Sequence, residues 1–410
     1  MHNNQFGNDM APNKVIALFE RSILETGFAP WMAAAWTVFI LSFFIVPNDS
    51  VHKDIFYYLI AGPLLISFFF VNYRFIFKEK LLLGYIILLL YLAFSCLWSP
   101  DYSFSYFFEK LRQSSYIVLF LVASMYIIKY CPRIMDYGLP LLFITSAITG
   151  VVMTFVFYAN LDWNFDSPLR PDWKFYNQIR LANTYGIIAL LSLICLIISH
   201  HKWLTACAIP TFSIAVLVLL LTRSQGGVYA FLLTLPCLLI VNKGTWIWLS
   251  KHILSTSLFL IGTFLVIIQL GIVENFINDG WSKRDVIWPA AIREWQNHAL
   301  FGSGMLIDPT ITGTDGSSYW HEHNLSLAIL RQSGLTGFLL FHGLYFTLLI
   351  RCAISTSVYP RICAVLLIFG FLATLPSGKF PVIRVEDTWF WVWLPIALAL
   401  ASLSRKHSDT

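Results

Sequence analysis

Residues 281–337 read WSKRDVIWPAAIREWQNHALFGSGMLIDPTITGTDGSSYWHEHNLSLAILRQSGLTG. This long segment carries Lys283-Arg284-Asp285 near its start and His321-Glu322-His323-Asn324 just before an apolar run. The sequence on both sides of it consists mainly of apolar runs. Cationic and imidazole side chains between such runs indicate a functional segment supported by membrane helices. Because guanidinium groups bind oxyanions through paired hydrogen bonds, the segment favours an anionic substrate.

The composition argues against an ordinary soluble protein. Of the 410 residues, 58% are hydrophobic and 12% are charged, whereas soluble domains are about 25% charged. Several apolar runs reach the roughly 20 residues that a helix needs to cross a hydrocarbon core. We therefore expect an all-α, polytopic integral membrane protein with a single transmembrane domain over residues 1–410. The start of the chain has no basic region leading into a short apolar core, so no removable signal peptide is expected.

About twelve membrane-spanning helices are expected from the apolar runs. The expected spans are 31–46, 55–73, 81–98, 114–130, 137–158, 184–199, 203–221, 228–241, 253–273, 335–353, 361–375 and 389–404. An even number leaves both termini on one side of the membrane. Lys and Arg divide almost equally between the two sides, but the short basic loop 74–80 and the tail 405–406 favour a cytoplasmic location for the termini. The long polar loop within residues 274–334 then lies on the periplasmic side.

Arg223 ends one apolar run in Leu221-Thr222-Arg223-Ser224-Gln225, followed by Gly226-Gly227. Its planar guanidinium could bind phosphate oxygens at the membrane surface. The two glycines would let a ligand approach the backbone. The alternative is an interfacial arginine that extends its charge into water without binding a ligand.

Arg284 precedes a run with helical spacing, so it is expected at or near a helix N-terminus. Backbone N–H groups at such a terminus add to anion binding. The neighbouring Lys283 is a further candidate cation. The alternative is an arginine paired with Asp285 on a solvated loop.

The His321-Glu322-His323-Asn324 run suggests three kinds of site. Because the histidine pKa lies near neutrality, either imidazole could act as a general base or hydrogen-bond donor. A metal site could add Asp308 and Asp315 as ligands, but a single His-x-His is a weak metal signal. The third reading is a purely structural histidine that caps the following helix.

The seven cysteines lie in or at the ends of apolar runs and form no CxxC motif. They are therefore expected to pack as small apolar residues rather than form a disulfide framework or a metal site.

Together these residues resemble the O-antigen ligase and polymerase superfamily of bacterial inner-membrane glycosyltransferases. His323-Asn324, nine residues and then Gly334-Leu335-Thr336-Gly337 are similar to the family's His-[Asn/Ser/Gln]-x9-Gly-x-x-Gly signature. Thr222-Arg223-Ser224 resembles the helix end with the first essential arginine, and Arg284 to Trp288 with the turn at 301–304 resembles the second. Arg180-Leu181-Ala182-Asn183 is more weakly similar to an upstream stretch. The resemblance covers about residues 180–337.

The resemblance implies a GT-C-like glycosyltransferase that works by an inverting, metal-independent transfer without a cofactor. The implied donor is a glycan on undecaprenyl pyrophosphate in the periplasmic leaflet of the inner membrane. For a ligase the acceptor is a sugar hydroxyl of the lipid A–core oligosaccharide. The implied catalytic residues are His323, Arg284 and Arg223. Further candidate substrate-binding residues are Lys283, His321, Asn324 and Arg180.

Other functions fit parts of the same pattern. A polymerase of the superfamily would use the same donor with a second lipid-linked glycan as acceptor. A protein O-oligosaccharyltransferase usually carries a larger C-terminal region. A transporter for an anionic lipid would need charged residues at membrane depth, where clear candidates are few. A non-catalytic assembly subunit would leave the arginines and His323 without a role.

Overall fold

The computed structural model describes residues 12–171, 177–199, 201–241, 283–306, 308–378 and 380–406. Within these ranges the chain is almost entirely helical, with one short antiparallel ribbon in which Ile311 pairs with Tyr319. The elements are α1 (Pro12–Ile45), α2 (Asp49–Phe56), η1 (Tyr57–Ala61), α3 (Gly62–Ser67), α4 (Arg74–Phe77), α5 (Lys80–Phe94), η2 (Ser95–Trp98), α6 (Phe104–Tyr130), α7 (Ile134–Ala159), α8 (Gln178–Ile198), α9 (Lys202–Leu221), α10 (Gln225–Thr234), η3 (Leu235–Ile240), α14 (Arg284–Asn297), β1 (Ile311–Thr312), β2 (Ser318–Tyr319), α15 (Leu325–Ala353), α16 (Val358–Thr374), η4 (Trp389–Trp393) and α17 (Leu394–Lys406).

Seven helices in the described part of the chain are long and apolar enough to cross a membrane. They are Gly27–Ile45, Lys80–Trp98, Phe104–Tyr130, Ile134–Ala159, Gln178–Ile198, Lys202–Leu221 and Leu325–Ala353. Three shorter apolar helices cover Gln225–Ile240, Val358–Thr374 and Trp389–Ser404. Helices suit this environment because each one satisfies its own backbone hydrogen bonds away from water. The apolar helices support a membrane protein, whereas the total of about twelve spans stays a prediction.

The expected spans agree closely with the observed helices. All of them except 253–273, which lies outside the described residues, coincide with helical segments. Several helices begin well before the expected spans: α1 begins at Pro12 rather than 31, α6 at Phe104 rather than 114, and α15 at Leu325 rather than 335. The span expected at 55–73 is shifted at both ends, because its helical segment begins at Asp49 and ends at Ser67. The side chain of Asn48 explains the early start, because it accepts a hydrogen bond from the Ser50 backbone N–H and caps the helix.

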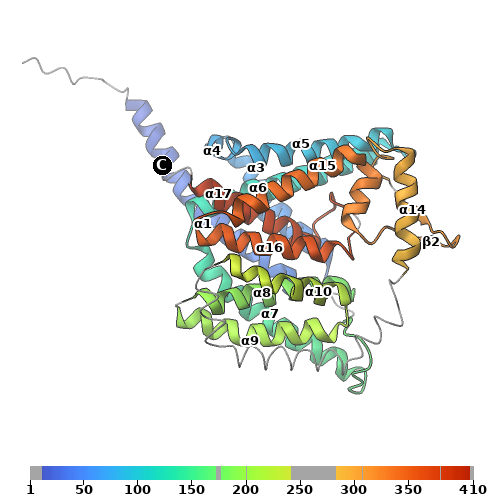
Figure 1. Cartoon of the computed structure of the whole chain (residues 1–410). Helices are drawn as coiled ribbons and strands as arrows, with labels where there is room; N and C mark the ends of the chain where they lie inside the picture. The colour runs from blue at the N-terminus through green and yellow to red at the C-terminus, as the bar shows by residue number, and fades with distance from the viewer. Residues whose placement is uncertain are drawn as a thin grey trace, which may run out of the picture.

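The long helices run side by side in layers, from α5 and α15 through α16 to α8 and α9 (Figure 1). The contacts between α8 and α9, α15 and α16, and α6 and α17 hold these layers together. In contrast, α14 runs across the right-hand end of the bundle, beside the β ribbon, while the C-terminus lies at the opposite end. The polar segment of residues 283–324 therefore covers one end of the helix bundle.

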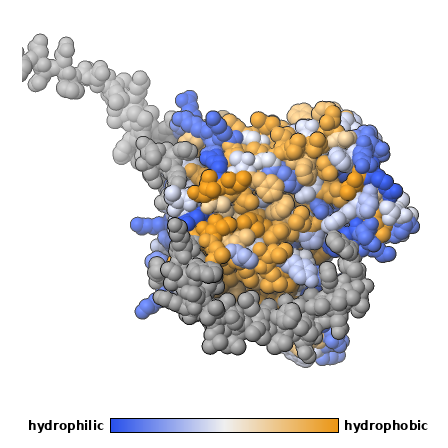
Figure 2. Space-filling view, in the orientation of Figure 1, coloured by the Kyte–Doolittle hydropathy of each residue, from blue (hydrophilic) through white to orange (hydrophobic). Residues whose placement is uncertain are grey.

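Apolar side chains cover the middle of the visible face, and hydrophilic side chains gather at its two ends (Figure 2). This distribution is typical of a protein whose middle contacts hydrocarbon and whose ends reach water. The seven cysteines are all free, and five of them are buried. Their predicted packing role is consistent with this burial.

Candidate active site

Helix α14 begins at Arg284, as the helical spacing predicted. The preceding residue, Lys283, has a positive φ of 64°, and its carbonyl oxygen accepts hydrogen bonds from Val286 and Ile287. Helix α14 buries Ile287 and its neighbours in a small apolar cluster shared with β1. The indole of Trp288 then donates a 3.1 Å hydrogen bond to the Glu322 carbonyl oxygen. This bond ties the second turn of α14 to the histidine-containing loop.

The Arg284 side chain is half-buried at the start of α14. Its Nη2 donates a 2.9 Å hydrogen bond to the Pro376 carbonyl oxygen. Burial lowers the pKa of Arg284 below its ordinary value, because removing water disfavours the charged form. An anion bound here would replace part of the lost hydration, so the location suits an oxyanion.

Arg223 lies between α9 and α10 in the left-handed backbone region, with a φ of 50°. Its Nη2 donates a 3.2 Å hydrogen bond to the Phe165 carbonyl oxygen. A second hydrogen bond joins the end of α9 to the loop that contains Phe165, because the Leu169 N–H donates to the Leu221 carbonyl oxygen at 2.8 Å. Arg223 is partly exposed, and its backbone is fixed between two helices.

The loop from His321 to Asn324 is held by local hydrogen bonds. The His323 backbone N–H donates to His321 Nδ1 at 3.0 Å, and the two ring centroids are 3.9 Å apart. A histidine nitrogen that accepts a hydrogen bond is unprotonated, which assigns the neutral His321 proton to Nε2. The Asn324 side chain accepts from the Leu327 N–H at 3.0 Å and caps α15. Substrate binding by Asn324 stays a prediction beside this capping role, and His323 has a positive φ of 52°.

Two glycines of the recognised motifs form a close backbone contact, which we call the glycine interlock. A Cβ at Gly334 would lie 2.4 Å from the Gly302 nitrogen, and a Cβ at Gly302 would lie 2.4 Å from the Gln332 carbonyl carbon. The adjoining backbones are hydrogen-bonded, with Leu335 N–H donating to the Ala299 carbonyl oxygen at 2.8 Å. Helix α15 breaks at Gly334, whose φ is 66° and ψ is −170°. The motif glycines thus join the segment after α14 to the break in α15.

A loop near the C-terminus contacts the elements that carry the two candidate arginines. This α16–η4 loop comprises residues 375–388 and is described except for residue 379. Its Pro376 accepts the hydrogen bond from Arg284 and also packs against Gly226, where an added Cβ would lie 2.7 Å from Pro376 Cγ. Because Gly226 follows Arg223 by three residues, the starts of α10 and α14 meet at this proline.

The same loop also reaches the start of α15. A Cβ at Gly378 would lie 3.1 Å from the Cβ of Leu325, which directly follows Asn324. The α16–η4 loop thus lies against the elements that carry Arg223, Arg284 and His323. Its sequence holds no recognised motif, so only the tertiary structure identifies it.

Arg180 is already paired with acidic side chains of the α16–η4 loop. Its Nη2 lies 3.2 Å from Glu386 Oε2, and its Nη1 lies 3.9 Å from Asp387 Oδ2. Both carboxylates are buried. The weak resemblance at 180–183 therefore marks a structural contact to the loop, and substrate binding by Arg180 stays a prediction. Lys110 of α6 also binds this loop, donating to the Val382 carbonyl oxygen at 3.3 Å.

Sequence reasoning did not identify Arg331. This residue lies inside the nine-residue spacer of the signature and is 1% exposed. It forms ion pairs with Glu322 of the histidine loop and Glu294 of α14. The sequence feature that could have identified Arg331 is its single charge within the apolar run after Asn324.

The two aspartates considered as metal ligands are engaged in local turns. The Asp315 carboxylate accepts hydrogen bonds from the Tyr319 hydroxyl at 2.7 Å and the Ser317 N–H at 3.0 Å. Asp308 likewise accepts from the Thr310 N–H at 3.1 Å. Across the described ranges, no three His, Cys, Asp or Glu side chains are grouped as metal ligands would be.

An apolar cavity of about 910 Å³ lies beside the glycine interlock. Its walls include Phe94 and Trp98 at the end of one long apolar helix and residues 298–303 after α14. The Trp98 indole donates to the Phe301 carbonyl oxygen at 3.2 Å, which fixes the two walls together. The site therefore borders an apolar space large enough for part of a lipid chain.

Two comparisons with known proteins match this chain. A family model described as O-antigen ligase matches residues 210–342, a region that includes Arg223, Arg284 and His323. A curated O-antigen ligase of Pseudomonas aeruginosa is 25% identical over 381 residues, which is 89% of this chain and 89% of the relative.

Proposed function

Because both matches support membership of the O-antigen ligase family and a ligase or glycosyltransferase activity, we propose that this chain is an inner-membrane O-antigen ligase. It transfers a glycan from undecaprenyl pyrophosphate to a sugar hydroxyl of the lipid A–core oligosaccharide. The transfer takes place on the periplasmic face, inverts the anomeric configuration and needs no metal or other cofactor. Both chain termini lie in the cytoplasm.

The observation that carries this proposal is the junction made by the α16–η4 loop. Pro376 binds Arg284 and packs against the helix start after Arg223, while Gly378 packs against the helix start after His323. Two guanidinium groups and one imidazole therefore come from elements that meet at one loop. These are the groups needed to stabilise a leaving pyrophosphate and to handle a hydroxyl proton.

The chemistry follows from the roles of these groups. The acceptor oxygen attacks the anomeric carbon on the face opposite the pyrophosphate. The bond between that carbon and the phosphate oxygen breaks, and its electron pair leaves with the pyrophosphate. Arg223 and Arg284 stabilise the developing negative charge through charge-assisted hydrogen bonds. The imidazole of His323 orients the acceptor hydroxyl and receives its proton.

The remaining candidate residues support these three. The exposed Lys283 adds positive charge beside Arg284, and His321 can donate from Nε2 because its Nδ1 accepts the His323 N–H. Asn324 acts by capping α15. Arg180 acts by anchoring the α16–η4 loop through Glu386.

Transfer by the purified chain, supplied with a lipid-pyrophosphate-linked glycan and lipid A–core in the presence of a chelator, tests the proposal. We expect glycan to appear on lipid A–core at the same rate with and without added Mg²⁺, because arginines carry the charge stabilisation. Extension of the lipid-linked glycan instead would indicate a polymerase. Transfer that occurs only with added metal would contradict the metal-independent mechanism. The transporter would be favoured if neither acceptor received glycan and the lipid-linked glycan instead crossed the membrane of vesicles that contain the chain.

A further inference from the structure

Arg331 joins three separate parts of the active-site end of the molecule. Its Nε pairs with Glu322 Oε1, its Nη1 lies 2.7 Å from Glu294 Oε2, and its Nη2 donates to the Pro309 carbonyl oxygen at 2.6 Å. The guanidinium on α15 thus contacts the histidine loop, α14 and the segment before β1. Arg331 and Glu322 are 1% and 0% exposed.

A buried ion pair of this kind contributes little net stability compared with apolar side chains of similar size. Such a pair instead favours one packing arrangement, because a different arrangement would leave a buried charge without its partner. Glu322 lies directly between His321 and His323. Arg331 holds its carboxylate, and Trp288 holds its carbonyl oxygen. The side chain and the backbone of Glu322 are therefore both held at the residue that separates the two histidines in the sequence.

We propose that Arg331 is a positioning residue that holds the loop of residues 321–324 through Glu322, so that the His323 imidazole keeps its orientation toward the acceptor. The proposal rests on the proposed function, since His323 is the group being positioned. Burial raises the pKa of Glu322, and the adjacent Arg331 charge opposes this rise. Among the described residues, Arg331 is the cation that forms an ion pair with this carboxylate.

Two variants separate positioning from stability. Arg331→Met leaves Glu322 buried without its cation and is expected to lower the unfolding temperature strongly. The double variant Glu322→Gln/Arg331→Met removes both charges, and its unfolding temperature is expected to return close to that of the wild type. Its kcat is still expected to fall about 10²-fold with little change in KM, because small misplacements of a reacting group cost this much. Amide hydrogen exchange at residues 321–324 is expected to accelerate.

A second ion pair on the same helix supplies the control. Arg351 lies 3.0 Å from Glu79 near the other end of α15. The double variant Glu79→Gln/Arg351→Met is expected to keep the kcat and the exchange rates of the loop. Wild-type kcat and exchange in Glu322→Gln/Arg331→Met would overturn the proposal.

Two further measurements keep the test decisive. If the double variant does not accumulate, the single variant Glu322→Gln removes the buried carboxylate charge and leaves Arg331 paired with Glu294, and unchanged exchange and kcat in that variant would also overturn the proposal. Hydrogen exchange does not depend on the reaction. An inactive wild-type chain would therefore refute the proposed function, while faster loop exchange in the variant would still support the positioning role.

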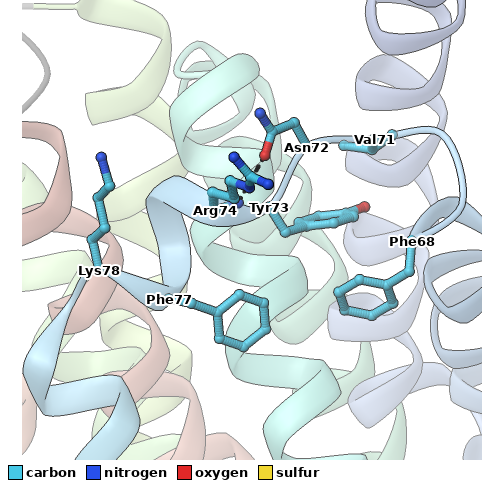
Figure 3. A pocket seen from close by; sticks show the side chains of 7 residues that line it. All are labelled: Phe68, Val71, Asn72, Tyr73, Arg74, Phe77 and Lys78. Carbon is cyan, nitrogen blue, oxygen red and sulfur yellow. Dashed lines mark hydrogen bonds between the residues drawn. The ribbon is translucent and has the colours of Figure 1, made fainter.

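A different observation concerns the end of the bundle opposite α14. A cleft of about 520 Å³ is lined by residues 71–74, Phe68, Phe77 and Lys78, and α4, which carries Arg74, lies at this end (Figure 1). In Figure 3 the charged ends of Arg74 and Lys78 point to one side of the cleft, and the rings of Phe68 and Phe77 lie on the other. The cleft therefore has a basic side and an aromatic side.

The charges in this cleft are not neutralised by its own lining. No carboxylate belongs to the lining residues. In the described part of the chain, the side chains of Arg74 and Lys78 form no ion pair, whereas the neighbouring Glu79 is paired with Arg351. The apolar surface continues beside the cleft through Phe69, which is 92% exposed. Two cations beside an exposed apolar surface match an anionic head group and its acyl chain.

We infer that this cleft binds the phosphate of an anionic membrane phospholipid, with the acyl chain against Phe68 and Phe77. The inference is independent of the catalytic proposal. Native mass spectrometry of the full chain with dioleoyl-phosphatidylglycerol, dioleoyl-phosphatidylcholine or inorganic phosphate measures the three affinities. We expect preference for phosphatidylglycerol, which the variant Arg74→Gln/Lys78→Gln weakens about 30-fold, the effect expected of two cations near an anionic surface.

The variant Arg133→Gln/Lys202→Gln is the control, because it removes two other exposed cations, one directly before α7 and one at the first residue of α9. It is expected to bind phosphatidylglycerol as the wild type does. Equal weakening in both variants would mean that general surface charge attracts the lipid, and this would overturn the inference. Equal binding of inorganic phosphate and phosphatidylglycerol would also overturn it, because the acyl chain would then contribute nothing.

Discussion

Arg284→Met is expected to lower the transfer rate about 10²–10³-fold, the usual cost of removing one preorganised donor to a developing negative charge. Arg284 occupies the first position of α14, where backbone N–H groups also favour an anion. The side chain is half-buried, and burial lowers its pKa. A leaving pyrophosphate would therefore interact with this cation in an environment that screens charge less than water does.

The measurement is single-turnover transfer to lipid A–core, with membrane insertion and unfolding temperature checked in parallel. Arg293→Met is the matched control, because Arg293 is an exposed arginine on the same helix, and its loss is expected to leave the rate unchanged. Arg284→Lys keeps the charge without the planar fork and is expected to give an intermediate rate. Equal transfer rates for Arg284→Met and Arg293→Met would show that Arg284 does not take part in the reaction. Arg223→Ala and His323→Ala are expected to abolish transfer while the protein stays inserted.

Gly334→Ala is expected to cause the largest loss of folded protein. With a φ of 66° and a ψ of −170°, Gly334 has a conformation that is almost restricted to glycine and costs other residues about 1–3 kcal/mol. The new Cβ would also lie 2.4 Å from backbone atoms of Leu300 and Gly302, and such overpacking adds about 1–3 kcal/mol. The sum is comparable to a large part of the stability of a typical protein.

The unfolding temperature and the yield of inserted protein measure this effect. Gly343→Ala provides the control on the same helix, because a Cβ at Gly343 would have no other atom within 4 Å. Alanine favours a helix over glycine, so this variant is expected to match or slightly exceed the wild-type stability. An unfolding temperature for Gly334→Ala equal to that of Gly343→Ala would show that the interlock tolerates a side chain.

Local sequence patterns predicted much of the fold. The apolar runs predicted nearly all of the observed long helices, and the helical spacing after Arg284 predicted the start of α14. The polar Asn324 before an apolar run gave the start of α15. These features depend on residues within a few turns of one another, so a single sequence is sufficient to predict them.

The parts that sequence reasoning missed depend on contacts between distant residues. Arg180 pairs with Glu386, which lies more than 200 residues further along the chain. Arg331 reaches Glu294 on another helix, and Pro376 binds Arg284 from a loop without a motif. No local periodicity encodes such pairs. The family resemblance selected the region of the candidate site, but the contacts that organise this region became visible only from the tertiary structure.

The left-handed backbones of Arg223, Lys283 and His323 create a conflict between heat resistance and activity. A non-glycine residue in this conformation costs about 1–2 kcal/mol, so glycine at any of these positions would relieve that cost while deleting the side chain. A laboratory screen that selects variants only by their survival on heating would therefore enrich glycine where the proposed mechanism uses a guanidinium, an ammonium or an imidazole group. If the proposed mechanism holds, thermostable versions of this protein need selection for turnover at every round, because the positions easiest to stabilise are among those that the mechanism uses.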